Sequence, residues 1–302
     1  MRAMTRAAMR ARRGATLVEL LVAMTLLAVV TTAAVGVVAR QWRLHAALDG
    51  RRAAREQLVA AAQALRAALR PASGDGEAGD PTDLVTVSDT LLEVRATIGA
   101  SVVCAVIDAR TAELPPESTV APSLTWWLTD PQPGDVAVVH GGASDAWQGA
   151  VVDTVSQRRA GCAGSPLVRA AEAGLSRLRL HVATALAGVV PGAPVRVVRS
   201  VRYLHYKASD GRWYLGEREW DGTAWTGTQP VAGPLRAPGA RGGLALVARD
   251  SAGAAVSAAR LPNTRVVAVD VVLRSDAPAA SGVRGLTTID TLALRIALRN
   301  GG

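Results

Sequence analysis

The side chains that most often carry catalysis are few in this sequence, and none stands in a spacing typical of an active site. Neither the HExxH pattern of zinc peptidases nor the GxSxG turn of serine hydrolases occurs. The four histidines have no second histidine and no cysteine two to four residues away: His45, His140, His181 and His205. We therefore expect no catalytic centre, no bound metal and no cofactor, and we do not expect an enzyme.

Acidic residues gather around one stretch that is also rich in tryptophan: Asp210, Glu217, Glu219 and Asp221. Carboxylates are the ligands that calcium prefers, but the spacing is not that of an EF-hand loop, so a calcium site is only the minor alternative. The chain has seven Trp and no Phe. We therefore interpret the tryptophans as packing residues and not as a sugar-binding platform.

The basic residues do not indicate a nucleic-acid partner. The formal net charge is +9, and five arginines without any acid precede Gly14, so the rest of the chain carries +4. No cluster of basic and aromatic residues on a helix suggests that it reads a nucleic-acid groove. We therefore expect no nucleic acid to bind.

One acidic residue, Glu19, lies within a long apolar segment, where a charge is energetically costly. From Ala15 to Ala39 the sequence is apolar, and Glu19 is its only ionisable side chain. As a helix this segment would be about 37 Å long, enough to cross a bilayer core of roughly 30 Å. A charged side chain costs about 2.5 to 3.5 kcal/mol at the centre of a spanning helix and less near its ends, so such residues usually have a function.

Two common export signals explain the segment less well. A secretory signal has an apolar core of about 7 to 15 residues before its cleavage site, and this segment is longer. A twin-arginine export signal fits Arg12 and Arg13. Neither of them explains Glu19.

The stretch "RRGATLVELLVAMTLLAVV" resembles the class III signal of type IV pilins and of the pseudopilins of type II secretion. The shared features are a short basic leader ending in Arg12 and Arg13, then Gly14, then a glutamate five residues later, Glu19, within an unbroken apolar run. Ala15 departs from the Phe that is most frequent after the glycine. The resemblance implies that a membrane-embedded prepilin peptidase cuts after Gly14 and methylates the new N-terminus on Ala15.

The resemblance also implies a role for Glu19 in assembly. Cleavage leaves an ammonium on Ala15, which is buried among apolar helices when subunits stack. A buried unpaired charge is costly, and a carboxylate from a neighbouring subunit offsets it. We interpret Glu19 as the residue that sets the register between subunits, with other minor and major pseudopilins or pilins as partners.

The helix is predicted to continue beyond the membrane as far as Arg70. Pro71 should end it, and a helix over 15–70 would be about 84 Å long. Apolar residues recur at helical spacing in its second half: Leu44, Leu48, Leu58, Val59, Ala62, Leu65 and Leu69. This half is expected to pack against a globular domain.

Beyond a loop at 71–82, apolar residues recur at every second position, which is typical of strands. The sequence "YKASDGRWYLGEREWDGTAW" has two Asp-Gly steps between aromatic runs, which favours hairpins. Strands are predicted at 84–88, 102–107, 124–129, 136–140, 177–182, 195–207, 264–274 and 291–300. The predicted fold class is α+β, a pilin-like lollipop with a long N-terminal helix and a β-rich head of one domain.

The domain prediction follows from these segments. It comprises a cleaved leader at 1–14, a transmembrane or filament-core helix at 15–39, its amphipathic continuation at 40–70, a loop at 71–82 and the head at 83–302. Since positive flanks stay in the cytoplasm, the leader places the head outside. Arg40 and Arg43 on the far side oppose this orientation but do not outweigh the leader.

The size of the head narrows the resemblance. With about 220 residues, the head is larger than that of most major pilins. The order of four segments is similar to that in the large minor pseudopilins of the J type and in large minor pilins: "PGDVAVVHG", "VRYLHYKASDGRWYLGERE", "GGLALVARDSAG" and "ALRN". Glu19 argues against the K-type tip subunit, which typically lacks this acid. The resemblance implies a structural subunit in the tip region of a type II secretion pseudopilus or a related filament. The alternative is a membrane-anchored or exported periplasmic enzyme or binding protein.

The resemblance implies a single-pass protein of the bacterial inner membrane with its head in the periplasm. Cys104 and Cys162 would both lie in that compartment. Two cysteines in an oxidising compartment usually form one disulfide. Two buried free thiols remain the alternative.

Overall fold

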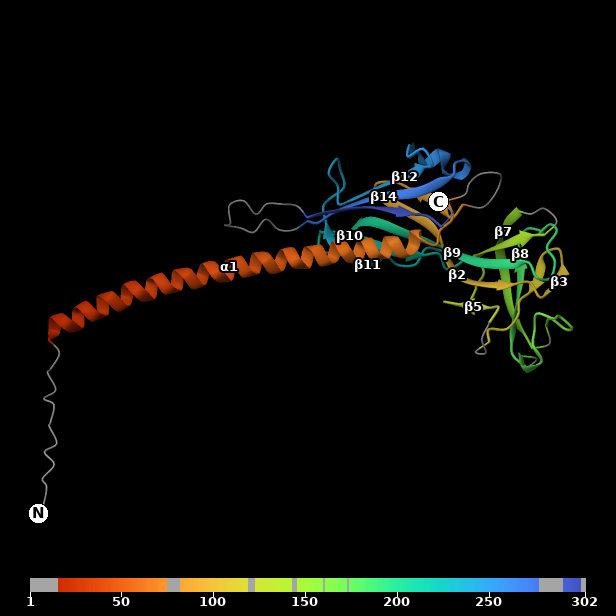
Figure 1. The fold of residues 1–302 in the computed structure, drawn as a ribbon, viewed down its shortest axis with the longest axis horizontal. Helices are drawn as coiled ribbons and strands as arrows, with labels where there is room; N and C mark the ends of the chain where they lie inside the picture. Colours follow the sequence, from red (N-terminus) through yellow and green to blue (C-terminus); the bar gives the residue numbers. More distant parts are fainter. Residues whose placement is uncertain are drawn as a thin grey trace, which may run out of the picture.

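One long helix leads into a β-rich head, as the sequence predicts (Figure 1). The computed structural model describes residues 16–74, 82–118, 123–142, 146–159, 161–172, 174–276 and 290–299. The leader and most of the predicted loop at 71–82 lie outside these ranges. The α+β class and the lollipop arrangement are confirmed.

Helix α1 spans Leu17–Leu69, 53 residues. It begins at a capping box formed by Thr16 and Glu19, and it ends at Leu69, two residues before Pro71. Between them, Ala- and Leu-rich sequence without a proline keeps the helix unbroken. The predicted bounds of this helix were therefore wrong by only one or two residues at each end.

The side of α1 that faces the head begins as a narrow stripe and widens toward the C-terminal end of the helix. The half-buried residues Ala47, Arg51 and Ala54 stand four and three positions apart. From Leu58 on, more of the circumference is buried or half-buried: Leu58, Ala60, Ala61, Ala62, Ala64, Leu65, Ala68 and Leu69. Leu44, Leu48 and Val59 were predicted on the apolar stripe but are exposed, so the fully buried contact begins only at Leu58.

Leu65→Ala should lower the free energy of unfolding of the head by about 3 kcal/mol, because Leu65 is 0% exposed and the truncation leaves a cavity. Leu44→Ala is the matched control on the same helix. Leu44 is 46% exposed, so its truncation should change stability by less than about 0.5 kcal/mol. Denaturant unfolding of the full chain in detergent, followed by near-UV circular dichroism, measures both. Equal losses would contradict the packing described above.

The first sheet has eleven antiparallel strands in the order β1-β2-β9-β6-β7-β8-β4-β3, with β5 beside β2, β10 beside β9, and β11 beside β10. Strand β9 is the centre of this arrangement because it pairs with β2, β6 and β10. The strand bounds are β1 Leu84–Val87, β2 Leu91–Val102, β3 Ala105–Asp108, β4 Thr111–Glu113, β5 Trp126–Trp127, β6 Val136–Gly141, β7 Ala146–Arg158, β8 Arg177–Val182, β9 Pro194–Lys207, β10 Trp213–Glu219 and β11 Gln229–Leu235.

The second sheet has four strands in the order β13-β12-β14-β15. The bounds are β12 Leu244–Asp250, β13 Ala255–Val256, β14 Val266–Arg274 and β15 Thr291–Ala297. Two short 3-10 helices, η1 at Ala170–Glu172 and η2 at Ala258–Asn263, complete the described elements.

The head contains two separate hydrophobic cores and therefore two lobes. The helix-side lobe joins buried residues of α1 with β1, β10, β11 and the second sheet. The distal lobe encloses buried residues of β4, β6, β7 and β8. Strands β2 and β9 contribute to both cores, and they pair over eleven positions.

Two predicted strands were misplaced. The strand expected at 102–107 is divided, since β2 ends at Val102 and the next two residues leave the ladder. The Val103 carbonyl accepts from the Gly192 N–H at 2.7 Å, and Cys104 joins the disulfide described below. The strand expected at 124–129 shortens to β5. Strand β2 itself was missed because a bulge between Thr97 and Gly99 breaks its alternating pattern.

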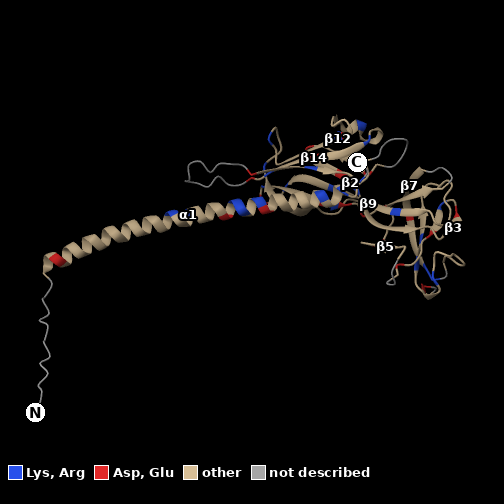
Figure 2. Cartoon of the chain, viewed as in Figure 1, with Lys and Arg blue, Asp and Glu red and all other residues tan. Residues whose placement is uncertain are grey.

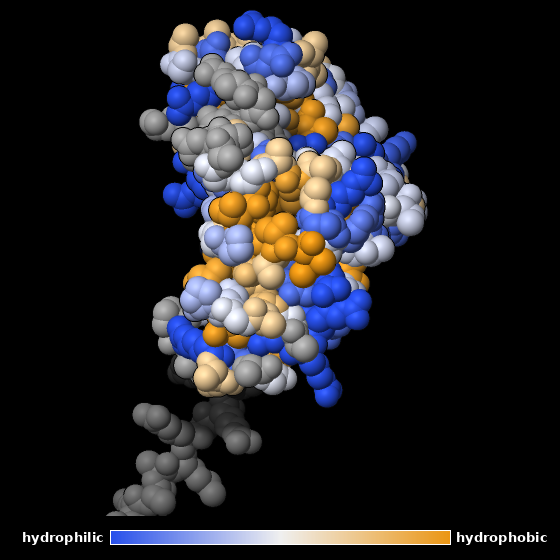
Figure 3. Space-filling model, turned by 90° about the vertical axis from the view of Figure 1, so that its right-hand side faces the viewer, coloured by the Kyte–Doolittle hydropathy of each residue, from blue (hydrophilic) through white to orange (hydrophobic). Residues whose placement is uncertain are grey.

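The distal end of the head shows apolar side chains at its surface, surrounded by hydrophilic residues (Figure 3). Exposed apolar residues of this lobe include Val106 and Ile107 on β3, together with Val190. Strand β3 is also the last strand of its sheet.

Candidate processing and assembly site

The N-terminal end of α1 holds the one described residue that the sequence assigned to assembly. The Glu19 N–H donates to the Thr16 hydroxyl at 3.3 Å, and the Thr16 N–H donates to Glu19 Oε2 at 3.2 Å. Both side chains are exposed. Gly14, Ala15, Arg12 and Arg13 lie outside the described residues, so their roles stay predictions.

The capping box gives Glu19 a partner within its own subunit. It satisfies backbone N–H groups that the first turn of a helix leaves without intrahelical acceptors. The sequence signal for this box, which was missed, is Thr16 followed three residues later by Glu19, directly before an apolar run. The structure therefore places the Glu19 carboxylate in the first turn of α1.

The apolar half of α1 has nothing packed against it in the described part of the chain. The helix is long and apolar enough to cross a membrane, and none of its most apolar window is buried. Leu17, Met24 and Val30 are among many large apolar residues exposed along it. An apolar surface of this size requires lipid or other apolar helices around it.

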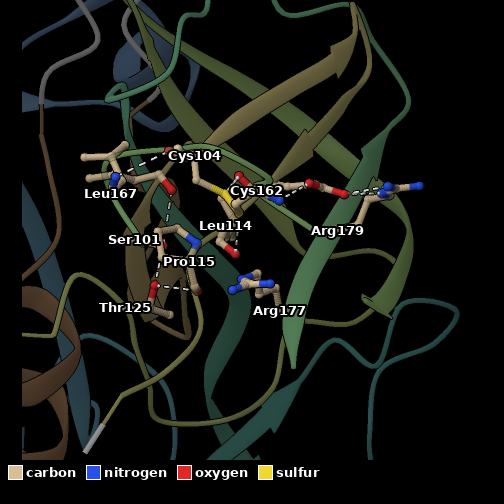
Figure 4. The surroundings of a disulfide bond; sticks show 12 residues. Ser101, Cys104, Leu114, Pro115, Thr125, Cys162, Leu167, Arg177 and Arg179 are labelled. Carbon is tan, nitrogen blue, oxygen red and sulfur yellow. Dashed lines mark hydrogen bonds and ion pairs between the residues drawn. A yellow bond between two sulfur atoms is a disulfide. The ribbon is translucent and has the colours of Figure 1, made fainter. Parts of the chain in front are cut away.

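The structure joins Cys104 and Cys162 in a disulfide, with 5.4 Å between their Cα atoms (Figure 4). The bond connects the turn after β2 to the segment between β7 and β8. Both cysteines are buried in the distal lobe. Beside the disulfide, the hydroxyls of Ser101 and Thr125 lie 2.6 Å apart, and Thr125 donates to the Pro115 carbonyl at 2.9 Å.

Glu113, at the end of β4, fixes the backbone on one side of this disulfide. Its carboxylate accepts the Cys162 N–H at 2.6 Å and pairs with Arg179 of β8, whose Nε lies 2.9 Å away. Burial would raise the pKa of Glu113, but these two donors hold that pKa below its ordinary value. A side chain on Gly161 would meet the same carboxylate, because an added Cβ would lie 3.0 Å from Oε2.

The histidines do not converge on a site. No group of three or more His, Cys, Asp or Glu suitable for a metal occurs in the described ranges. His181 Nδ1 lies 3.5 Å from Asp153, and His205 is 6% exposed with its ring tilted against Trp213. Burial lowers the pKa of His205.

The acidic residues of the hairpin stretch divide into two turn residues and two strand residues. Asp210 accepts from the Arg212 N–H and the Tyr214 hydroxyl, and Asp221 accepts from the Thr223 and Ala224 N–H groups. Both aspartates therefore stabilise Asp-Gly turns.

Glu217 and Glu219 instead lie on β10 beside β9. Burial, followed by the charge of Glu219, raises the pKa of Glu217, and the Tyr203 hydroxyl opposes this shift. Trp225 of the same stretch packs edge-to-face against Trp220 and lies under the Arg202 guanidinium, 3.8 Å from the ring centroid. The tryptophans at this position act in packing.

Sequence reasoning missed two buried ion pairs that fasten the long strand β9. Arg196 binds Asp83 at 2.7 Å, and Arg199 binds Asp135 at 2.8 Å. Both carboxylates are almost fully buried. Strand alternation alone cannot distinguish an arginine that points to solvent from one that finds a distant buried carboxylate.

Comparison with known proteins gives one match. Residues 9–35 match the prokaryotic N-terminal methylation motif. No curated protein and no solved structure matches the chain. The matched residues contain Gly14, Ala15 and Glu19 together with the first part of the apolar helix. The N-terminus of this protein therefore carries a prepilin-type, type IV pilin-like class III signal.

Proposed function

We propose that this protein is a minor pseudopilin-like structural subunit without enzymatic activity. It is inserted in the bacterial inner membrane with its head in the periplasm and is cut after Gly14. It then enters the tip region of a type II secretion pseudopilus or a related type IV filament. The N-terminal methylation motif over residues 9–35 is the observation that carries this proposal.

The structure supports the proposal in three respects. The apolar half of α1 is exposed over its whole length and needs a lipid or helical environment. Glu19 lies in the first turn, where it can meet the ammonium that cleavage would create on Ala15. The Cys104–Cys162 disulfide fits an oxidising compartment.

Gly14→Leu should leave a precursor in the membrane, because a side chain at this position would crowd the protease cleft where the backbone must lie extended. The precursor should be about 1.6 kDa heavier than the mature chain, by the mass of the fourteen leader residues. It should also be unmethylated. An immunoblot and the intact mass of the purified chain measure these differences.

Gly36→Leu is the matched control. Gly36 lies within the same apolar helix and has open space around it, so the same change there should leave cleavage unaffected. Normal maturation of Gly14→Leu, or a wild-type chain that begins beyond Val35, would refute the proposal. The second outcome would favour an exported periplasmic protein.

A further inference from the structure

The charge of the chain is distributed unevenly along α1. The helix from Arg40 to Arg70 holds seven arginines against Asp49 and Glu56, whereas residues 71–302 hold 22 basic and 22 acidic residues. Figure 2 shows this contrast between the blue positions along the middle of the helix and the mixed colours of the head. The net positive charge of the chain after Gly14 therefore lies on the helix.

Two arginines and a tryptophan stand at the start of this charged stretch. We call these residues the collar: Arg40, Trp42 and Arg43. They follow the apolar segment directly, and all are exposed, Trp42 to 73%. At 3.6 residues per turn, Arg40 and Arg43 lie on one side of the helix, about 60° apart, and Trp42 points to another side. In the described part of the chain, neither arginine forms a hydrogen bond or an ion pair, so their donors are available to a ligand.

The chemistry of the collar matches that of a lipid headgroup region. Tryptophan prefers the membrane–water interface, because its ring is apolar and its N–H is polar. Arginine can extend its aliphatic stem along acyl chains while its guanidinium donates two parallel hydrogen bonds to a phosphate. The position of the collar at the end of a segment long enough to span the bilayer brings both groups to that depth.

We propose that Arg40, Trp42 and Arg43 bind anionic phospholipid headgroups of the outer leaflet and hold the processed subunit in the membrane before assembly. This inference rests on the proposed membrane insertion. Cleavage after Gly14 removes every arginine on the inner side of the span, and no basic side chain remains before Arg40. The collar is then the main electrostatic anchor, and a subunit leaving the bilayer toward the periplasm must release it.

The same helix offers a matched control for this contact. Arg52 and Arg55 are also exposed, and neither forms a hydrogen bond or an ion pair in the ranges that the structure covers. They lie about 14 to 18 Å farther along the axis than Arg43, at about 1.5 Å per residue. This separation exceeds the Debye length of about 8 Å at physiological ionic strength, so the membrane surface should affect these two arginines much less.

The test uses the full processed chain, beginning at Ala15, in vesicles of equal phosphatidylglycerol and phosphatidylcholine. Spin-labelled lipids of each type report which headgroup is enriched around the protein. The wild type should prefer phosphatidylglycerol, and Arg40→Gln/Arg43→Gln should lower this preference by up to about fivefold for each arginine removed. Arg52→Gln/Arg55→Gln removes the same charge and should keep the wild-type preference.

Two further measurements complete the test. Brominated phosphatidylglycerol should quench the fluorescence that Trp42 contributes, which is obtained as the difference between wild type and Trp42→Phe. A wild type without lipid preference, or equal losses in the two double variants, would overturn the inference. Resistance to alkaline carbonate extraction tests the span separately, since wild-type protein released by this wash would refute the proposed membrane insertion.

Discussion

Replacing Glu19 with leucine should leave the protein inserted and processed but should reduce its incorporation into a filament at least hundredfold. The variant segment is more apolar, so insertion is not impaired. In the assembled filament, the ammonium of Ala15 would lack its carboxylate. Removing one member of a buried ion pair costs about 3 to 5 kcal/mol, because the remaining charge stays uncompensated, and this corresponds to a factor of a hundred or more.

Two variants separate the charge of Glu19 from its role in the capping box. Glu19→Gln keeps an acceptor for the Thr16 N–H but removes the charge, so it should fail to assemble. Thr16→Val removes the hydroxyl that accepts the Glu19 N–H at 3.3 Å and keeps the carboxylate. Loss of a cap costs about 1 kcal/mol, so this variant should assemble far better than either change at Glu19.

The measurement is site-specific crosslinking of processed, membrane-inserted subunits to their neighbours. Processed Glu19→Leu protein that does not crosslink is the expected outcome. Wild-type crosslinking would mean that Glu19 is only a charge tolerated at the membrane edge. A failure of processing would assign Glu19 to recognition by the peptidase.

Removing the disulfide should destabilise the distal lobe by roughly 4 kcal/mol, from the entropy of the closed loop in the unfolded chain. Cys104 and Cys162 are 58 positions apart. The test is denaturant unfolding of a Cys104→Ser/Cys162→Ser double variant. This variant keeps the hydrogen bond from the backbone N–H of position 162 to the Glu113 carboxylate. Intact mass without reductant should also be about 2 Da below that of the reduced chain, since oxidation removes two hydrogens.

The control for the disulfide is the wild type reduced and alkylated after unfolding, which should incorporate two labels. Protein isolated without reductant should incorporate none. Two reactive thiols in that sample would contradict the bond, and unchanged unfolding of the double variant would contradict its stabilising role.

The long helix was predictable from the sequence because it depends on local chemistry. Apolar length and Pro71 bound the helix to within two residues of the observed Leu17–Leu69. The energetic cost of Glu19 in an apolar segment likewise needs no tertiary contact to be seen, and its role in assembly stays a prediction. Regular alternation likewise located β8, β9, β14 and β15.

Features that depend on distant pairing could not be predicted. Asp83 and Arg196 are 113 positions apart, and only the folded sheet brings them together. Arg177 at the start of β8 is buried, where its guanidinium donates to the carbonyls of Arg159 and Glu172, and the alternation of that strand gives no sign of these partners. The division of the head into two cores also has no local signal, because β2 and β9 serve both.

The pairing of β2 with β9 has a mechanical consequence. Both strands extend through the two lobes, in opposite directions, and the ladder between them covers eleven positions. Its hydrogen bonds lie perpendicular to the strands, so a force that enters through one strand and leaves through the other loads them together in shear. A hairpin pulled apart from its open end loses its bonds one pair at a time at lower force. Strands β2 and β9 therefore join the two lobes as one hydrogen-bonded ribbon, and a load carried from α1 toward the far end of the head passes along both backbones at once.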